Sequence, residues 1–206
     1  MEVYKFGGAS LKDAASVKNV AEVVLNTGVK DKVIVVSAMG KMTNAFELVV
    51  AGYLEKLIIP KEKISEVKDY HFSIANELFN NELHPIFKKI NSLFEELENF
   101  MVHNKSTQYD FVYDQIVCFG ELISSTILSA WFQEVGIDHT PIDSRELIKT
   151  DSTYRDATVN WNATQENIST HINAGKLYLT QGFIAADANN FSTTLGREGS
   201  DYTAAI

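Results

Sequence analysis

The chain has 206 residues, of which 45% are hydrophobic and 22% are charged, and its formal net charge is −9. This length suits one large domain or one and a half small ones, and the hydrophobic content excludes a disordered chain because it can form a sizeable core. The acidic balance, with no run of Lys or Arg, argues against non-specific binding to nucleic acids or anionic membranes.

Cysteine use and segment composition narrow the class of protein further. The single cysteine, Cys118, excludes an intramolecular disulfide and a cysteine-based metal cluster, and the five histidines have no metal-ligand spacing. The first residues lack the regions of a signal peptide, and no apolar run approaches the roughly 18 residues of a membrane span. We therefore expect a cytoplasmic globular protein.

The first ten residues predict a strand that leads into an anion-binding loop. Residues 2–6 form a short strand with Lys5 near its end, then come Gly7-Gly8-Ala9-Ser10 and an amphipathic helix over about residues 12–26. Glycines let backbone N–H groups approach an anion, and a helix N-terminus favours negative charge. The loop matches neither a P-loop nor a dinucleotide fingerprint, so an ordinary tight turn explains the glycines equally well.

A second strand is followed by a second polar loop. Residues 32–38 are almost all apolar and β-branched, which is typical of a strand buried on both faces in a parallel sheet. In the loop that follows, the hydroxyl groups of Ser37 and Thr43 could bind a carboxylate or a phosphate. Alternatively, Thr43 is only the N-cap of the next helix, with Glu47 in its first turn.

The middle of the chain is predicted to be helical, because apolar residues recur there with a period near 3.6. The predicted helices cover residues 43–57, 62–83, 85–103 and 109–133. No Pro/Gly/Ser-rich linker flanks them, so we expect a helical excursion between about residues 43 and 135 rather than a second domain.

The last of these helices contains Phe119-Gly120-Glu121 in an apolar stretch. Burying the carboxylate of Glu121 is unfavourable unless it meets a cation, such as the ammonium group of an amino acid. A solvent-exposed glutamate is the alternative. Cys118 is expected to be a small core residue, since no histidine lies beside it in the sequence.

The remaining third alternates strands and helices. Strands are predicted at residues 136–143, 158–160 and 177–185, and helices at residues 145–148 and 162–174. This alternation predicts an α/β fold with a mainly parallel sheet, in which ligands bind beyond the carboxyl ends of the strands.

A third polar loop lies at residues 193–201 and includes Arg197, Ser200 and Asp201 beside two glycines. Arginine binds a carboxylate or phosphate through two hydrogen bonds, and the aspartate could orient a lysine. A turn with Ser200 or Asp201 as N-cap would explain the serine and the aspartate but not the whole cluster.

Taken together, these features resemble the aspartate kinases of the amino-acid kinase superfamily. The matching segments are, in chain order, residues 5–10, 37–44, 119–121, 142–145, 181–185 and 194–205. The resemblance spans nearly the whole chain. It implies a three-layer α/β/α sandwich with a mainly parallel sheet, similar to carbamate kinase.

The resemblance also implies an activity, namely ATP-dependent phosphorylation of the side-chain carboxylate of L-aspartate to 4-phospho-L-aspartate. This is the first step toward lysine, threonine and methionine. The partners would be L-aspartate and MgATP, with Mg2+ carried by ATP rather than by a metal site of the protein. The parent protein would be a homo-oligomer without nucleic-acid or membrane partners.

Residue roles follow from the same resemblance. The catalytic residues would be Lys5, which offsets the charge on the transferred phosphoryl group, and Asp201, which orients Lys5 or the reacting groups. Phosphate and ATP would be bound by Lys5, Gly7, Gly8 and Ser10. Aspartate would be bound by Ser37, Thr43, Glu121, Phe183, Arg197 and Ser200, with Arg197 on a carboxylate and Glu121 on the ammonium group.

The sequence departs from the pattern of the family at two positions and at its end. Ala9 replaces a threonine, and Glu198 replaces a glycine near the anion site. In the family, the segment after the position of Ile206 carries most of the nucleotide pocket, and regulatory ACT domains follow. We therefore expect residues 1–206 to be the truncated, N-terminal substrate-binding portion of a kinase domain, inactive or weakly active by itself.

Two other functions stay open at this point. The chain could belong to another amino-acid kinase, of the glutamate 5-kinase or acetylglutamate kinase type, or it could be an inactive fragment that only binds an amino acid. A nicotinamide dehydrogenase is disfavoured because the dinucleotide fingerprint is missing.

Overall fold

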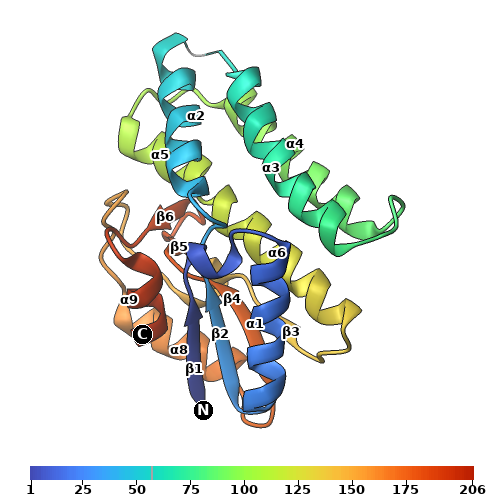
Figure 1. The fold of residues 1–206 in the computed structure, drawn as a ribbon. Helices are drawn as coiled ribbons and strands as arrows, with labels where there is room; N and C mark the ends of the chain where they lie inside the picture. Colours follow the sequence, from blue (N-terminus) through green and yellow to red (C-terminus); the bar gives the residue numbers. More distant parts are fainter. Residues whose placement is uncertain (57) are drawn as a thin grey trace.

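A parallel sheet forms the centre of the chain in the computed structural model, which describes residues 1–56 and 58–206 (Figure 1). Its strands are β1 (Glu2–Phe6), β2 (Lys32–Val36), β3 (Thr140–Pro141) and β4 (Leu177–Gln181), in the order β1-β2-β4-β3. All neighbouring pairs are parallel. The carboxyl ends of the strands therefore meet at one edge of the sheet.

Helices cover both faces of this sheet, as the burial of a parallel sheet requires. One face is covered by α1 (Ala14–Thr27) and α6 (Phe119–Glu134). The other face carries α8 (Trp161–His171) and α9 (Gly199–Ala205), with the short α7 (Ser144–Leu147) beside them. The predicted α/β fold with a mainly parallel sheet is confirmed.

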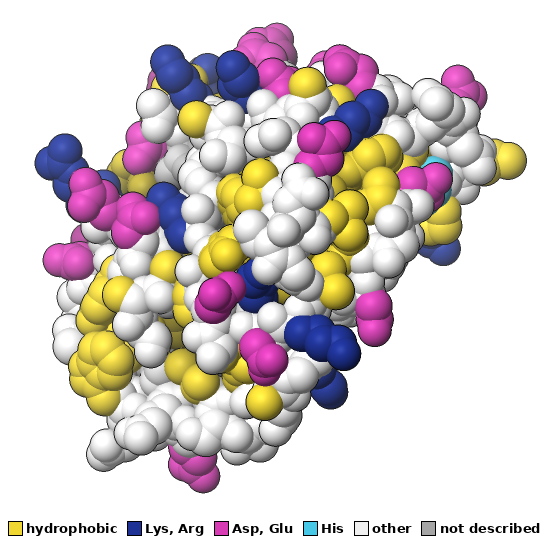
Figure 2. Space-filling view, turned by 60° about the horizontal axis from the view of Figure 1, so that its bottom comes forward, with side chains coloured by type: hydrophobic (Ala, Val, Ile, Leu, Met, Phe, Trp, Pro, Cys, Tyr) yellow, Lys and Arg dark blue, Asp and Glu magenta, His cyan; other side chains and the backbone are white. Residues whose placement is uncertain are grey.

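The second face carries an apolar pocket, lined by residues of β1, β2, α7, α8 and α9. Seen with the lower side of Figure 1 turned forward, hydrophobic side chains reach the surface near α8 and α9, with few charged ones among them (Figure 2). The exposed hydrophobic residues of β1, α8 and α9 and of the N-terminus are Met1, Val3, Trp161 and Tyr202.

The predicted helical excursion is present as a set of long helices that extend from the sheet (Figure 1). It consists of α2 (Met42–Lys56), α3 (Lys61–Leu78), α4 (Pro85–His103) and α5 (Tyr109–Val117), which leads into α6. The predicted end of the first of these helices at residue 57 lies outside the described residues. Helix α3 ends at Leu78, five residues before the predicted end at residue 83, because Phe79 takes an extended conformation.

The helix predicted over residues 109–133 is present as α5 and α6. Cys118, which separates them, keeps a right-handed helical conformation, so the two run on as one helix over Tyr109–Glu134. Together they cover 26 residues, and an 18-residue window within them reaches a mean hydropathy of 1.3. By length and composition alone this stretch is long and apolar enough to cross a membrane. However, 83% of that window is buried inside the protein, as in the core helix of a soluble protein.

The strand predicted over residues 177–185 is also interrupted. It comprises β4 and β5 (Ile184–Ala186), and β5 pairs antiparallel with β6 (Ser192–Thr194) in a separate two-stranded sheet. The interruption falls at Phe183, whose φ of +69° turns the chain away from the parallel sheet. As a result β6 leads directly into the third polar loop.

Three other predicted elements are longer than the elements in the structure. The strand at residues 136–143 is reduced to β3, and around residue 159 there is only an isolated bridge between Val159 and Thr150. Residues 8–11 form a 3-10 turn, and α1 begins only after Asp13, whose side chain accepts a hydrogen bond from the Ser16 N–H (2.7 Å).

Candidate active site

A cavity of about 510 Å³ lies where β1, β2 and β4 end. Eight of the eleven predicted site residues line it: Lys5, Ser37, Thr43, Glu121, Phe183, Arg197, Ser200 and Asp201. Five lining residues were not predicted: Tyr113, Arg155, Gly196, Glu198 and Gly199. The carboxyl edge of a parallel sheet is where α/β folds bind their ligands.

Lys5 and Asp201 form an ion pair at this edge. The Lys5 Nζ lies 3.0 Å from Asp201 Oδ1, and the lysine side chain is 25% exposed whereas the aspartate is 60% exposed. Lys5 projects from the end of β1 and Asp201 from the first turn of α9, so the pair joins residues almost 200 positions apart. The ammonium group is therefore fixed in place but still open to a ligand.

The glycine loop packs against the second polar loop. A Cβ on Gly8 would lie 2.5 Å from the Gly40 carbonyl oxygen and 2.8 Å from that of Ala38, whereas one on Gly7 would meet only the Lys5 Nζ at 3.5 Å. The Gly40 N–H also donates a hydrogen bond to the Gly8 carbonyl (2.9 Å). Gly8 is thus required by the contact between the two loops.

Gly7, Gly8 and Ser10 do not line the cavity. Ser10 is exposed on the 3-10 turn, and its N–H donates to the Gly7 carbonyl (2.9 Å). Phosphate binding by these three residues stays a prediction.

The second polar loop brings Ser37 and Thr43 to the cavity. The Ser37 carbonyl accepts a hydrogen bond from the Ser124 hydroxyl of α6 (2.7 Å), which fixes the loop to the helical layer. Thr43 is the second residue of α2 and not the residue before it, so the N-cap alternative is wrong. Glu47 accepts a hydrogen bond from the Tyr113 hydroxyl (3.0 Å).

Glu121 is buried at the cavity, with 2% of its surface exposed, so the solvent-exposed alternative is wrong. Its Oε1 accepts a hydrogen bond from the Ala38 N–H (3.1 Å), but no donor in the described part of the chain reaches Oε2. Burial raises the pKa of this carboxyl group to about 8. Such a group needs either a proton or a cationic ligand.

The third polar loop turns through two left-handed residues, Gly196 and Glu198, before α9 begins at Gly199. Glu198, not Ser200 or Asp201, precedes the helix, so the N-cap alternative for those two residues is wrong. Glu198 is one of the residues that line the cavity.

No sequence pattern indicated Arg155 as a lining residue, or Asp114 as the residue that holds its loop. Asp114 is fully buried in α5 and accepts hydrogen bonds from the N–H of Arg155 (2.9 Å) and from the N–H and hydroxyl of Thr194 (2.9 and 2.7 Å). Burial raises the pKa of Asp114 to about 6. Its acidic side chain in an apolar stretch was the same signal that drew attention to Glu121. Arg155 itself has no glycine-rich neighbourhood that could have marked it.

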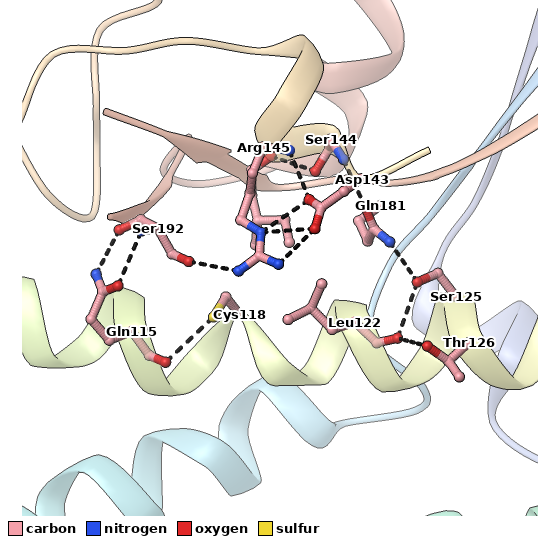
Figure 3. Close-up of polar contacts among 11 residues, drawn as sticks. Gln115, Cys118, Leu122, Ser125, Thr126, Asp143, Ser144, Arg145, Gln181 and Ser192 are labelled. Atoms are coloured by element: carbon pink, nitrogen blue, oxygen red, sulfur yellow. Dashed lines mark hydrogen bonds and ion pairs between the residues drawn. The ribbon is translucent and has the colours of Figure 1, made fainter. Parts of the chain in front are cut away.

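A polar network holds β6 in place behind the cavity (Figure 3). The side-chain amide of Gln115 exchanges two hydrogen bonds with the backbone of Ser192 (2.7 and 3.0 Å), and the Ser192 hydroxyl accepts a hydrogen bond from Arg145 (3.2 Å). Arg145 is paired in turn with Asp143 at 2.6 Å. This network fixes the strand that carries the third polar loop.

The same network reaches the end of β4. The side chain of Gln181 accepts a hydrogen bond from the Ser144 N–H (2.8 Å) and donates one to the Ser125 hydroxyl (2.7 Å). Cys118 lies next to Gln115 in Figure 3, and its thiol donates to the Gln115 carbonyl (3.4 Å). Burial raises the pKa of this thiol to about 12, which agrees with a core residue rather than a nucleophile.

The fold and this site define an α/β protein with a polar cavity at the carboxyl edge of its sheet. A model of the amino acid kinase family matches residues 1–206, and the chain belongs to this family.

The similar proteins are aspartokinases. The chain is 30% identical over 211 residues to a bifunctional aspartokinase/homoserine dehydrogenase 1 of Arabidopsis thaliana, covering 99% of this chain and 23% of that protein. It is 28% identical to the lysine-sensitive aspartokinase 3 of Escherichia coli, covering 99% of this chain and 45% of that protein. The chain thus spans less than half the length of these relatives.

A solved structure is similar over the same extent. Escherichia coli aspartokinase III in complex with aspartate and ADP matches with a TM-score of 0.83 and 26% identity, covering 98% of this chain and 45% of that chain. Its complex with lysine and aspartate matches with a TM-score of 0.82 at 28% identity.

Proposed function

We propose that this chain binds L-aspartate and presents its side-chain carboxylate for phosphorylation by ATP, giving 4-phospho-L-aspartate. The similarity to aspartokinases, one of them solved with aspartate and ADP, supports this substrate pair. The observation that carries the proposal is the buried Oε2 of Glu121, which has no partner among the described residues and lies at a cavity that two arginines also line.

The charges of the cavity match those of aspartate. The ammonium group of the substrate would lie on Glu121 and supply the missing partner of Oε2, while a guanidinium such as that of Arg197 would bind a carboxylate. Ser37, Thr43, Phe183 and Ser200 line the same space. They would complete the pocket around the substrate.

In the transfer step, an oxygen of the aspartate side chain attacks the γ-phosphorus of ATP, and ADP leaves with the electron pair of the broken bond. This carboxylate is already ionised at neutral pH, so no general base is required. Lys5 would offset the negative charge of the transferred phosphoryl group, and Asp201 would hold Lys5 in position through their 3.0 Å ion pair. The phosphates of ATP are proposed to bind at Gly7, Gly8 and Ser10.

Mg2+ would enter with ATP. Among the described residues, no group of three or more His, Cys, Asp or Glu side chains could hold a metal ion. Asp201, which lies beside Lys5, is already paired with that lysine. The proposal therefore assigns Mg2+ to the phosphates of ATP rather than to protein side chains.

The adenosine side of the site is proposed to lie in sequence beyond this chain, because the chain spans only 45% of the aspartokinase that was solved with ADP. Residues 1–206 would then be the substrate-binding portion of a longer cytoplasmic kinase. By itself this portion would bind aspartate and show little or no turnover.

The direct test is a coupled assay of ADP release by the complete product of the gene. L-aspartate is expected to support turnover, and L-glutamate and N-acetyl-L-glutamate are expected not to. Preference for either of these two acids would assign the chain to another branch of the family. If the complete protein binds aspartate but neither binds MgATP nor releases ADP, the chain is a binding module and the proposed reaction is wrong.

A further inference from the structure

Two arginines line the cavity, but the resemblance to the family accounts for only one of them. Arg155 lies between α7 and α8, whereas Arg197 lies in the loop between β6 and α9. Their segments are paired, since Asp156 forms an antiparallel bridge with Leu195 and the Ala157 N–H donates to the Thr194 carbonyl (3.0 Å).

Arg155 has a backbone conformation that disfavours any side chain. Its φ of +69° lies in the left-handed region, where a glycine would be free of strain. Strain of this kind persists at sites where the surrounding structure enforces it and where the side chain has a use. Here the enforcing contact is the 2.9 Å hydrogen bond from the Arg155 N–H to Asp114.

Asp114 holds the two arginine-bearing segments together. The same carboxylate oxygen, Oδ2, accepts hydrogen bonds from the N–H of Arg155 and the N–H of Thr194, three residues before Arg197. The network of Gln115, Ser192 and Arg145 in Figure 3 holds the same strand from behind. Both arginine-bearing segments are therefore fixed to one buried anchor.

The guanidinium group of Arg155 is supported but still available. It lies over the ring of Tyr113 at 4.5 Å and near that of Tyr109 at 5.4 Å, and Tyr113 is itself held by Glu47. Its ion pair with Asp110 is 3.6 Å long between side chains that are 46% and 53% exposed. Such a solvent-screened pair holds its partner weakly, and stacking on a ring leaves the N–H donors at the guanidinium edge free.

The other charged residues that line the cavity leave Arg155 available to bind an anionic ligand. Lys5 is paired with Asp201, and the acidic residue Glu198 also lines the cavity. Arg155 and Arg197 are then the two guanidinium groups that can meet a ligand with two carboxylates. A ligand with only one carboxylate would use only one of them.

We propose that Arg155 is a specificity-determining residue that binds the second carboxylate of the substrate and so selects dicarboxylic amino acids over their amides. This inference rests on the proposed acidic amino-acid substrate. It adds a contact that the resemblance to the family does not predict.

Calorimetric titration of the 206-residue chain with L-aspartate and L-asparagine tests the proposal, because the two ligands differ only in the second carboxylate. Arg155→Gln is expected to weaken aspartate binding about tenfold or more and to change asparagine binding less than about twofold, while Arg155→Lys keeps most of the aspartate affinity. The proposal is overturned if aspartate affinity is unchanged, if both ligands weaken equally, or if the unmodified chain does not prefer aspartate to asparagine.

Two further variants separate binding from folding. Arg155→Gly suits the left-handed backbone, so it should keep the melting temperature and still lose aspartate affinity. Lys30→Gln removes the same charge from an exposed turn before β2 and should bind both ligands as the unmodified chain does. If the unmodified chain binds neither amino acid, the proposed substrate is wrong, whereas binding that is indifferent to Arg155 overturns only this inference.

Discussion

At the scale of single residues, Glu121 sets the chemistry of the cavity. Its pKa of about 8 means that it carries a proton at neutral pH as long as no cation faces Oε2. A bound ammonium group would favour the ionised form and lower this pKa. Binding of an amino acid is then coupled to the release of a proton from Glu121.

This coupling predicts that aspartate affinity rises between pH 6 and pH 8 and levels off above the pKa of free Glu121. The sign follows because the free protein holds a proton that the complex does not. Calorimetry in buffers of different ionisation enthalpy would detect the released proton. An affinity that is independent of pH over this range would contradict the placement of the ammonium group on Glu121.

A second prediction concerns stability without ligand. The pKa of Glu121 is raised in the folded chain from 4.5 to about 8, so its stabilising effect is complete below about pH 4.5 and is lost as the pH rises to about 8. Glu121→Gln removes this loss and should raise the free energy of unfolding by about 4 kcal/mol at pH 8, with a smaller difference at pH 5. Urea denaturation at both pH values measures it, and a variant that is less stable at pH 8 would show that burial is not the cause of the shift.

The sequence could identify site residues only where a local pattern marked them. Lys5 follows from a strand end before glycines, and Glu121 from an acid in an apolar helix. Arg155 reaches the cavity through the pairing of its segment with the Thr194–Leu195 segment, and Tyr113 reaches it from α5. Those tertiary contacts have no periodic or compositional signature.

At the scale of elements, prediction succeeded where the local signals were complete. Helix α4 begins at Pro85 and ends at His103 as predicted, because a proline suits the first helical position and the apolar spacing is regular. The break at Phe183 could not be predicted, since β-type residues continue on both sides of it. There, a hydrogen bond from the Gly182 N–H to the Val36 carbonyl ends the parallel pairing, and the Leu195 N–H then donates to the Phe183 carbonyl.

The contact between the first two polar loops predicts unequal effects for adjacent glycines. Gly8→Ala would place a Cβ 2.5 Å from a backbone oxygen, so it should displace the loop and destabilise the fold by about 2 kcal/mol. Gly7→Ala meets only ordinary contacts, has a negative φ, and should be nearly neutral. Thermal denaturation of the two variants checks this, and equal melting temperatures would contradict the packing of the loops.

At the scale of the whole molecule, the parallel sheet positions the site at its carboxyl edge, while hydrophobic side chains near α8 and α9 stay exposed to solvent. The three strand ends, the helical layer and α9 bring together residues from positions 5 to 201 around one cavity. Beyond this, hydrophobic side chains near α8 and α9 remain at the surface (Figure 2). Composition and periodicity predicted the fold class and the helical excursion but not these exposed hydrophobic side chains, which depend on tertiary packing.

The central claim is that the cavity binds the ammonium group and the carboxylates of aspartate together. The most direct measurement is a calorimetric titration of the 206-residue chain at pH 8 with L-aspartate and, in parallel, with succinate, which has both carboxylates but no ammonium group. Aspartate should bind at least about tenfold more tightly than succinate, because only aspartate supplies a partner for Oε2 of Glu121. Equal affinities, or no binding of aspartate, would contradict the account.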